Sequence, residues 1–392
     1  MERVKNHISF NQPYISGNEF EYIQQAISTL KLSGNGLFTQ KCHSFFQEKY
    51  GFKKCLLTSS CTDALEMAAI LLDINPCDEV IMPSYTFVST ANAFVLRGAK
   101  IVFCDSHANH PGIDETKIEP LITEKTKTIV VVHYAGFACE MNTIMDIANK
   151  YNLFVVEDAA QAIDNYYIDP KTGKKKALGG IGHLAAFSFH ETKNIIAGEG
   201  GMLVINDEQF LKRAEIIWEK GTNRTAFFRG EVDKYGWVDI GSSFLPSEIT
   251  AAFLFAQLEN LEKIQTQRKV IWDLYETKLE KLKQFGVTLP HQPDFSTNNA
   301  HIFYLVCNSL DERTKLIEYL LSNNIIAVFH YLSLHKSPFY QNNSSQKYDL
   351  PHSDHFSDKL LRLPFYFELS EKQITNISDR ISTFYEKLNN KE

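Results

Sequence analysis

A lysine and an aspartate in the middle of this 392-residue chain have side chains of the types that bind a cofactor with an aldehyde group and a pyridine ring. Lys193 lies in segment 187–194 (Phe-Ser-Phe-His-Glu-Thr-Lys-Asn), and Asp158 ends the apolar run of segment 155–161 (Val-Val-Glu-Asp-Ala-Ala-Gln). A lysine amine condenses with the aldehyde of pyridoxal phosphate, and a carboxylate keeps the pyridine nitrogen of that ring protonated, so that the ring accepts electrons. Together, the two residues predict a pyridoxal phosphate site.

Each residue also has an ordinary structural interpretation. Taken alone, Lys193 is consistent with a surface lysine, and Asp158 with the N-cap of a helix that follows a strand. A third signal favours the functional interpretation. Residues 58–65 (Thr-Ser-Ser-Cys-Thr-Asp-Ala-Leu) leave a strand and open a helix, where unpaired N–H groups and hydroxyls bind phosphate, although Ser and Thr also cap helices that bind nothing.

Several segments resemble those of the DegT/DnrJ/EryC1/StrS family of sugar-nucleotide aminotransferases. They are 134–136 (Tyr-Ala-Gly), 157–161, 187–194 and 198–201 (Gly-Glu-Gly-Gly), and the resemblance runs from about Phe10 to the C-terminus. Segments 83–94 and 219–224 are also similar to those of members that make dTDP-4-amino-4,6-dideoxygalactose. The resemblance implies pyridoxal 5'-phosphate as the cofactor and Lys193 as the residue that serves both half-reactions.

The resemblance also assigns cofactor contacts to individual residues. Cys61, which stands where the family typically has glycine, and Thr62 would bind the phosphate, and Ser188 would add a hydroxyl. Gln161 would donate to the phenolic oxygen of the ring, and Phe87 would stack on the ring. Without the resemblance, Ser188 is equally a strand serine, Gln161 a solvated helix residue, and Phe87 one of 28 phenylalanines in a core.

A further segment concerns assembly. Family members usually carry Gly-x-Asn-x-Arg before a long helix, and the asparagine reaches the cofactor phosphate of the partner subunit. Residues 241–245 here read Gly-Ser-Ser-Phe-Leu, so Ser243 replaces the asparagine and Leu245 replaces the arginine. Ser243 can still donate one hydrogen bond, whereas the missing arginine argues against transferring contacts from distant relatives. We expect a homodimer with its sites at the interface.

The candidates for binding a nucleotide-linked sugar are less specific. Arg224 and Arg229 could hold a diphosphate through bidentate contacts, and His330, Tyr331 and His335 could lie at the mouth of the site. Surface arginines and loop histidines are the ordinary alternative. The histidines show no His-Glu-x-x-His spacing, so no metal site is expected.

Composition restricts the function further. A net charge of −7 without a basic stripe argues against nucleic acid, and residues 171–176, the one basic cluster, are expected to form an exposed turn. The seven scattered cysteines lack Cys-x-x-Cys spacing, which indicates neither disulfides nor zinc and fits a cytoplasmic location. No apolar run approaches the roughly 20 residues of a membrane span, so we expect a soluble enzyme.

The elements that position these residues follow from the hydrophobic pattern. Short β-branched runs alternate with helical segments such as 61–72 and 142–151, which favours a mostly parallel sheet with helices on both faces. A Rossmann enzyme shares this alternation, but no Gly-x-Gly-x-x-Gly follows the first strand. The expected strands are 54–58, 79–82, 100–104, 128–132, 153–157, 184–189 and 202–205.

The C-terminal part has a different pattern. A helical pattern runs from Pro246 to about Leu282, and we expect it to join a large cofactor-binding domain (1–250) to a smaller C-terminal α/β domain (251–392). The resemblance identifies this order as fold type I of the pyridoxal phosphate-dependent transferases. The smaller domain is expected to hold strands 301–306 and 325–329, helices 312–322 and 371–387, and a polar loop at 337–353.

The implied reaction moves an amine from L-glutamate to C4 of dTDP-4-dehydro-6-deoxy-D-glucose, giving dTDP-4-amino-4,6-dideoxy-D-galactose and 2-oxoglutarate. Amination at C3, a gluco product and a UDP-linked substrate stay open. A sugar 3-dehydratase is disfavoured because related dehydratases carry histidine at the position of Lys193. A non-catalytic nucleotide-sugar-binding protein is disfavoured because Lys193, Asp158 and Gln161 are all intact.

Overall fold

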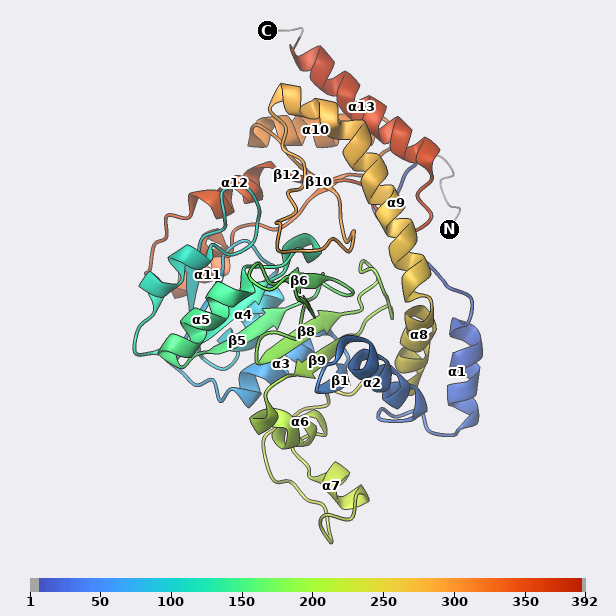
Figure 1. Cartoon of the computed structure of the whole chain (residues 1–392), viewed down its shortest axis with the longest axis vertical. Helices are drawn as coiled ribbons and strands as arrows, with labels where there is room; N and C mark the ends of the chain where they lie inside the picture. The colour runs from blue at the N-terminus through green and yellow to red at the C-terminus, as the bar shows by residue number, and fades with distance from the viewer. Residues whose placement is uncertain (1–6, 390–392) are drawn as a thin grey trace.

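The computed structural model of the chain describes residues 7–389 (Figure 1). Its centre is a seven-stranded sheet in the order β1-β9-β8-β5-β4-β2-β3. The pairs from β3 to β8 are parallel, whereas β9 pairs antiparallel with both β8 and β1, so the predicted mostly parallel sheet is confirmed. The strands are β1 (Lys54–Thr58), β2 (Glu79–Pro83), β3 (Lys100–Cys104), β4 (Thr126–Val132), β5 (Phe154–Asp158), β8 (Leu184–Ser188) and β9 (Gly201–Ile205).

Helices cover both faces of this sheet because most strand residues are apolar and nearly all are buried. Neighbouring residues point to opposite faces: Val155 packs in one core cluster and Val156 in the other. One face is covered by α3 (Cys61–Leu71), α4 (Val88–Val95) and α6 (Leu211–Trp218), and the other by α2 (Leu37–Tyr50), α5 (Met141–Tyr151) and α8 (Glu248–Glu259), with α1 (Glu19–Ser28) packed against α8.

The sheet register brings three predicted site segments to one edge. Because β1 and β8 are both antiparallel to β9, they run in the same direction, and Gly201 pairs with both Thr58 and Ser188. β5 runs parallel to β8 and ends at Asp158. The ends of β1, β5 and β8, which carry the phosphate segment, Asp158 and Ser188, therefore lie at the same edge of the sheet.

A second, smaller sheet lies above this edge in the view of Figure 1. It is antiparallel, in the order β10-β12-β11, and its core includes Tyr85 and Tyr134 from the large sheet's loops. Its elements are β10 (Tyr304–Val306), β11 (Val328–Phe329), β12 (Leu360–Arg362), α9 (Leu261–Leu279), α10 (Leu310–Ser322), α12 (Pro351–Lys359) and α13 (Glu371–Asn389). The division at residue 250 remains a proposal, and the packing of Ala251 and Leu254 in the large-sheet core favours a boundary farther along the chain, in α9.

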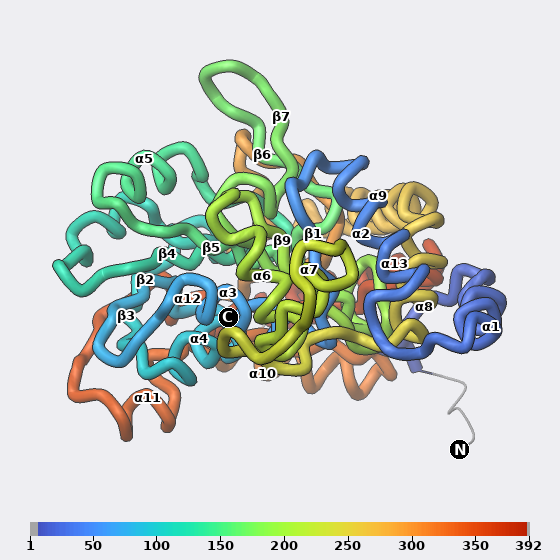
Figure 2. The backbone as a smooth tube through the Cα atoms, turned by 90° about the horizontal axis from the view of Figure 1, so that it is seen from below, coloured from blue at the N-terminus to red at the C-terminus, as the bar shows by residue number. Residues whose placement is uncertain are grey.

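The structure differs from the sequence prediction at two places. The expected helix from 246 to 282 is interrupted at Asn260, whose side chain donates to the Ala256 carbonyl at 3.0 Å and ends α8. The expected loop at 337–353 contains α11 (Pro338–Asn343), which Ser337 caps by accepting a hydrogen bond from the Tyr340 N–H. The basic cluster, in contrast, forms the exposed turn that the sequence predicts and continues into β7: it connects β6 (Tyr166–Ile168) and β7 (Lys175–Ala177) in a hairpin that projects from the body of the molecule (Figure 2).

The remaining elements are short. At the lower end in Figure 1, α7 (Arg224–Phe228) belongs to an arm, residues 222–245, that extends away from the sheet.

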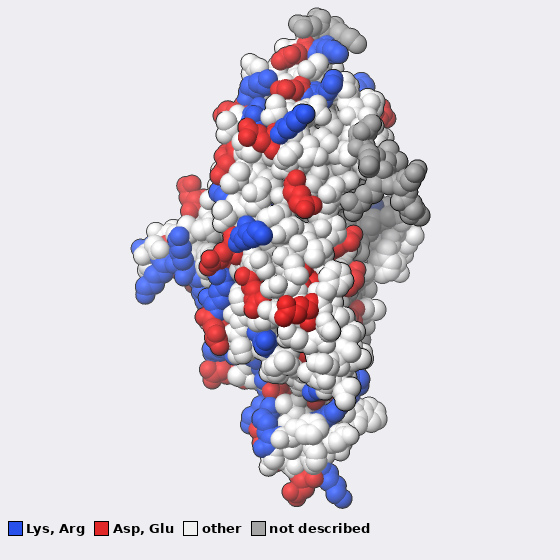
Figure 3. All heavy atoms as spheres, turned by 90° about the vertical axis from the view of Figure 1, so that its right-hand side faces the viewer, with Lys and Arg blue, Asp and Glu red and all other residues white. Residues whose placement is uncertain are grey.

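Acidic and basic side chains are interspersed over the face shown in Figure 3. Within residues 7–389, no helix has both the length and the apolar character needed to cross a membrane. The short 3-10 helices are η1 (Glu115–Lys117), η2 (Glu119–Leu121), η3 (Tyr134–Gly136), η4 (Glu208–Phe210), η5 (Glu280–Phe285) and η6 (Leu334–Lys336).

Candidate active site

A cavity of about 910 Å³ lies between the edge of the large sheet and the small sheet, within the size range of ligand sites. Both Lys193 and Asp158 line it, so the fold brings together the pair on which the sequence argument depends. The other predicted residues on its wall are Cys61, Thr62, Phe87, Gln161, Ser188, His330 and Tyr331.

Asp158 is held by neutral donors. Its Oδ2 accepts a hydrogen bond from Thr90 Oγ1 at 2.7 Å, and its Oδ1 accepts one from the Ala160 N–H at 3.2 Å. Burial raises the pKa of this carboxyl, while the Thr90 bond and the positive charge of Lys193 act in the opposite direction. Because no basic side chain neutralises Asp158 within hydrogen-bond distance in the described structure, it can pair with a cationic ring nitrogen.

Lys193 follows β8 in an irregular loop and is half-buried. Burial lowers the pKa of its amine, and the charge of Arg362 lowers it further, whereas the carboxylate of Asp158 raises it. The lowered pKa increases the fraction of neutral amine, which is the nucleophilic and proton-accepting form. The neighbouring Asn194 fixes the loop, because its side chain donates to Gln265 and to the Asn299 carbonyl, both at 2.8 Å.

The start of α3 forms the predicted phosphate segment. Ser60 caps the helix by accepting the Asp63 N–H at 3.0 Å, and Thr62 Oγ1 donates to Ser89 at 2.8 Å. Gly201 lets this turn approach β9, since a Cβ there would lie 2.3 Å from the Ser60 carbonyl group and 2.4 Å from Cys61 N. Burial raises the pKa of Cys61 well above its ordinary value, so its thiol is neutral. The turn presents a helix start and hydroxyls to the cavity.

Gln161 connects two walls of the cavity. Its Oε1 accepts the Ala135 N–H at 2.7 Å, and its Nε2 donates to the Tyr331 hydroxyl at 3.0 Å. Ala135 has a left-handed φ of 58°, a strained conformation for a non-glycine residue that this bond holds in place. Tyr331 stacks on His330 with ring centroids 3.6 Å apart, and His330 Nδ1 pairs with the Tyr134 hydroxyl at 2.6 Å.

Phe87 stands just before α4 and leaves 53% of its surface exposed. Its ring centroid lies 6.0 Å from that of Tyr331. An aromatic ring that is open on the cavity side has a free face for stacking on a planar ligand.

Some predicted residues lie away from this chain's cavity. Arg229 is engaged by Glu215 at 2.9 Å and Glu231 at 2.7 Å, and Arg224 packs its guanidinium 5.2 Å from the Phe228 ring centroid. Both belong to the arm, as does the exposed Ser243, whose backbone forms an isolated antiparallel bridge with that of Glu219. Their roles remain predictions that involve a second subunit. His335, expected at the mouth, is instead buried behind the wall and pairs with Ser84 at 2.8 Å.

Three residues of the site were missed by sequence reasoning. Thr90 anchors Asp158, but a threonine inside a helix carries no sequence signal of that contact. His301, on the cavity wall, pairs with Asn194 at 2.7 Å, and burial lowers its pKa far below the usual range, so it is neutral. Arg362 comes from β12, a strand too short to predict.

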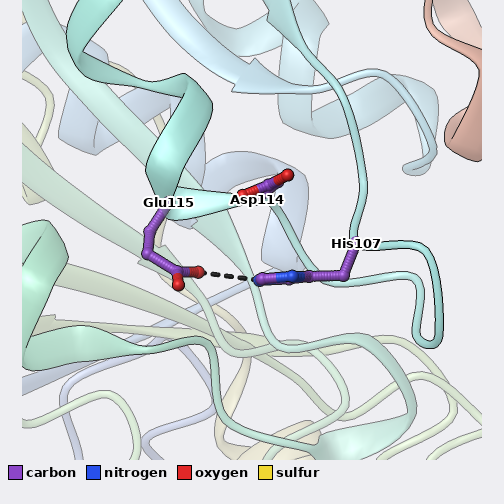
Figure 4. A group of neighbouring side chains, drawn as sticks. All are labelled: His107, Asp114 and Glu115. Atoms are coloured by element: carbon purple, nitrogen blue, oxygen red, sulfur yellow. Dashed lines mark hydrogen bonds and ion pairs between the residues drawn. The ribbon is translucent and has the colours of Figure 1, made fainter.

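One group of side chains outside the cavity has the composition of a metal site. His107 Nε2 lies 2.7 Å from Glu115 Oε2, and Asp114 is adjacent (Figure 4). Asp114 also accepts the Thr116 N–H, and Lys117 lies 3.7 Å from it. These partners account for the arrangement, and the expectation of no metal site stays a prediction.

Comparisons with known proteins identify the family of this chain. The model of the DegT/DnrJ/EryC1/StrS aminotransferase family matches residues 13–382. A GDP-perosamine synthase of Escherichia coli O157:H7 is 31% identical over 387 residues, 97% of this chain and 99% of that protein. The spore coat polysaccharide biosynthesis protein SpsC of Bacillus subtilis is 30% identical over 393 residues, 97% of this chain and 98% of that protein.

A solved structure shows the same fold. The crystal structure of DesV from S. venezuelae has a TM-score of 0.87 and 25% identity, and the match covers 97% of this chain and 99% of that one. The expected fold of a pyridoxal phosphate-dependent transferase is thereby confirmed. The chain belongs to the DegT/DnrJ/EryC1/StrS aminotransferase family and is a sugar aminotransferase that depends on pyridoxal phosphate.

Proposed function

We propose that this enzyme transfers the amine of L-glutamate to C4 of dTDP-4-dehydro-6-deoxy-D-glucose, giving dTDP-4-amino-4,6-dideoxy-D-galactose and 2-oxoglutarate. The observation that carries the proposal is the meeting of Lys193 and Asp158 on the wall of one cavity. The sugar and its nucleotide are supported by segments 83–94 and 219–224, which are similar to those of enzymes that make this product.

The cavity wall fits pyridoxal phosphate. The cofactor, when bound, supplies an electron-accepting ring that makes the bonds to the amine-bearing carbon labile. Asp158, free of any basic partner in the described structure, would hold the proton on the ring nitrogen. The phosphate would be held by the start of α3, with Cys61 and Thr62, and by Ser188. Gly201 leaves room for this turn, because a Cβ there would collide with the backbone of Ser60 and Cys61.

Two further residues would orient the ring. Phe87 would cover one of its faces and exclude water, and the Gln161 amide would donate to its phenolic oxygen. Gln161 has two amide hydrogens, and the bond to Tyr331 uses one of them. The other remains available for a ligand.

Lys193 would move the protons of both half-reactions. Its neutral amine, favoured by the lowered pKa, would take the proton from Cα of glutamate. In the second half-reaction the same side chain would deliver a proton to C4 of the sugar. His301 and His330 also line the cavity, but burial lowers both pKa values well below the ordinary range, and neither residue is suited to act as a base of comparable strength.

We further propose a homodimer in which Ser243 reaches the partner's phosphate. Support comes from the arm, which exposes large apolar side chains: Trp237 leaves 86% of its surface exposed and Phe228 leaves 70%. Such surfaces on a soluble enzyme are usually covered by another protein. A cytoplasmic location is likewise a proposal, supported by seven cysteines of which none is paired within the described structure.

The substrate is identified by a panel assay. The enzyme is incubated with L-glutamate and dTDP-, UDP- and GDP-linked ketosugars, and the amino sugar is assigned by NMR. The GDP-linked compound is included because one relative is named GDP-perosamine synthase. We expect the highest kcat/KM with dTDP-4-dehydro-6-deoxy-D-glucose and a galacto-configured C4 amine. A preference for another nucleotide, amination at C3 or a gluco product would refute this assignment.

Mixed dimers test the shared site. Lys193→Ala chains are combined with Ser243→Asp chains, whose added carboxylate would repel the phosphate of the partner's site. Random pairing should restore about one quarter of wild-type activity, since half of the dimers are mixed and each of these has one intact site. Ser242→Asp, a change at the neighbouring exposed serine, is the matched control and should stay active alone. Mixed dimers that form but remain inactive would contradict the proposal.

A further inference from the structure

A buried histidine that precedes the small sheet is bonded to the loop that carries Lys193. His301 lies on the cavity wall just before β10, and only 4% of its surface is exposed. Its Nδ1 lies 2.7 Å from Oδ1 of Asn194, the residue that follows Lys193. Although the two residues are 107 positions apart in the chain, this pair connects the two sides of the cavity beside the reactive amine.

The hydrogen bonds of Asn194 determine which nitrogen of His301 carries the hydrogen. Asn194 Nδ2 lies 2.8 Å from both the Gln265 Oε1 and the Asn299 carbonyl oxygen. A backbone carbonyl only accepts, so the atom beside it must be the amide NH2 group, and both hydrogens of that group are used. The other amide atom, Oδ1, can only accept, and therefore Nδ1 of His301 donates to it.

His301 consequently presents an acceptor at its second nitrogen. Burial and the charges of Lys193, Arg268 and Arg362 lower the pKa of the imidazole well below its usual range, so the ring is neutral. In a neutral ring with its hydrogen on Nδ1, Nε2 carries a lone pair. Within residues 7–389 no group donates to this atom, and unlike Nε2 of His335 it is not closed off from solvent.

The Lys193 amine lacks an acceptor in its own surroundings. Within the described part of the chain it forms no hydrogen bond, and the charged groups that face it are Asp158 and Arg362. A buried ammonium is costly unless it is hydrogen-bonded. If Asp158 serves the cofactor ring, it is engaged elsewhere, and the Cys61 thiol is neutral. The lone pair of His301 is an acceptor on the wall of the same cavity that is not otherwise used.

We propose that His301 Nε2 accepts a hydrogen bond from Lys193 whenever that side chain is free of the cofactor and carries the proton that it moves. His301 is then a positioning residue, because it acts through Lys193 and neither takes nor gives a proton itself. This inference rests on the proposed role of Lys193 in both half-reactions and adds the group that holds its ammonium form between them. It does not depend on which ketosugar is the second substrate.

Cofactor uptake by the full-length apoenzyme measures the pKa of the amine without turnover. Pyridoxal phosphate condenses with the neutral amine, so the second-order rate, followed by absorbance, rises with pH through the pKa of Lys193. An acceptor stabilises the ammonium and keeps this pKa higher. In His301→Phe, which keeps a flat ring without the lone pair, the profile should move toward lower pH by about one pH unit. An unchanged profile would overturn the proposal.

Two further variants separate the lone pair from the shape of the ring. The amide in His301→Gln can donate to Asn194 and accept from Lys193, so its profile should stay close to that of the wild type. His110→Phe is the matched control, because His110 is also buried and neutral but does not line the cavity. A shift in His301→Gln or in His110→Phe as large as that in His301→Phe would show that the acceptor is not the cause and would overturn the assignment.

The state of the ring is tested without relying on His301→Phe. In enzyme labelled with ¹⁵N at histidine, the resonances that disappear in His301→Gln belong to His301. Between pH 6 and 8 we expect a neutral ring with its hydrogen on Nδ1, and Nε2 should shift when the cofactor is removed and the Lys193 amine is set free. A hydrogen on Nε2, a protonated ring at pH 7 or an Nε2 that does not respond would overturn the proposal, even if His301→Phe does not fold.

Kinetics distinguish this role from substrate binding and from failure of the proposed function. The reaction with L-glutamate and the reverse reaction with the amino sugar nucleotide both use Lys193, so in His301→Phe kcat of each should fall about tenfold with little change in KM. A loss confined to one half-reaction, or one expressed in KM alone, would overturn the proposal. A wild type that reacts with glutamate but with none of the ketosugars would refute the proposed substrate and leave the uptake and ¹⁵N tests of His301 valid.

Discussion

Thr90 Oγ1 donates a hydrogen bond to Asp158 Oδ2 over 2.7 Å, and this contact joins α4 to the end of β5. Thr90 itself pairs with the Thr86 hydroxyl at 2.9 Å, so a short chain of hydroxyls supports the carboxylate. All three residues are buried. The acid that would hold the cofactor ring is therefore oriented by α4. Phe87, which would stack on that ring, directly precedes the same helix, so α4 connects the two residues.

Thr90→Val removes this hydroxyl while keeping the shape of the side chain. We expect kcat to fall about tenfold, because a lost hydrogen bond of roughly 1 to 1.5 kcal/mol would let Asp158 leave its position. Thr128→Val is the control, since Thr128 is equally buried but its hydroxyl has no partner within the described residues. Steady-state kinetics of both variants check the prediction, and a Thr90→Val enzyme with wild-type kcat would show that Thr90 does not position the acid.

Asp158→Asn tests the acid itself. A neutral amide no longer holds the proton on the ring nitrogen, so the enzyme should stay folded and lose activity on the order of a thousandfold or more. Circular dichroism and kcat measure the two effects separately. Asp311→Asn, at a side chain that is 72% exposed, should be neutral. Near-normal turnover of Asp158→Asn would exclude the assigned role.

Gly201→Ala should weaken cofactor binding. The added Cβ would collide with the Ser60–Cys61 peptide at about 2.3 Å, which would displace the start of α3 from the cavity. We expect the dissociation constant of pyridoxal phosphate, measured by equilibrium dialysis, to rise at least about tenfold. Gly236→Ala, where a Cβ meets nothing within 4 Å, is the control. Unchanged affinity in Gly201→Ala would argue against this turn as the phosphate site.

Acid should destabilise the fold through His43. Burial and the nearby Lys54 lower the pKa of this residue to about 3, and His43 Nε2 accepts the Leu57 N–H at 2.9 Å. The unfolded chain, with a histidine pKa of about 6.5, binds a proton that the folded chain refuses, so stability is complete above about pH 6.5 and is lost as the pH falls toward 3.

The magnitude of this acid effect can be measured in a variant. His43→Gln keeps an acceptor for Leu57 and does not titrate. Between pH 7.5 and 5.0, urea denaturation should therefore show a decrease in the free energy of unfolding that is smaller than in the wild type by about 2 kcal/mol. His291→Gln, at an exposed position, should behave as the wild type does. An unchanged pH dependence in His43→Gln would show that His43 is accessible to protons.

The central sheet and the residues expected to bind the cofactor were predictable, because the sequence patterns that identify them are local. β1 and β3 begin and end at the predicted residues, and Lys193 and Asp158 lie next to strands whose parallel register brings their ends together. Family motifs then identified Gln161, whose position on the cavity wall agrees with the structure.

The rest of the site depends on contacts between distant parts of the chain. Arg362 ends a three-residue strand that packs beside the cavity only through the small sheet. His335 was misplaced because its burial depends on Ser84, which belongs to the large domain. Neither short strands nor such distant pairings leave a periodic pattern in the sequence.

Transfer of labelled nitrogen tests the central claim most directly. The enzyme is loaded with pyridoxal phosphate and incubated with ¹⁵N-labelled L-glutamate and dTDP-4-dehydro-6-deoxy-D-glucose, and the sugar is analysed by NMR. The wild type should place ¹⁵N on C4 of the sugar, and Lys193→Arg, which keeps the charge but not the reactive amine, should place none. Labelled amino sugar from Lys193→Arg at the wild-type rate would contradict the assignment of Lys193, and a wild type that leaves every ketosugar unlabelled would contradict the proposed reaction.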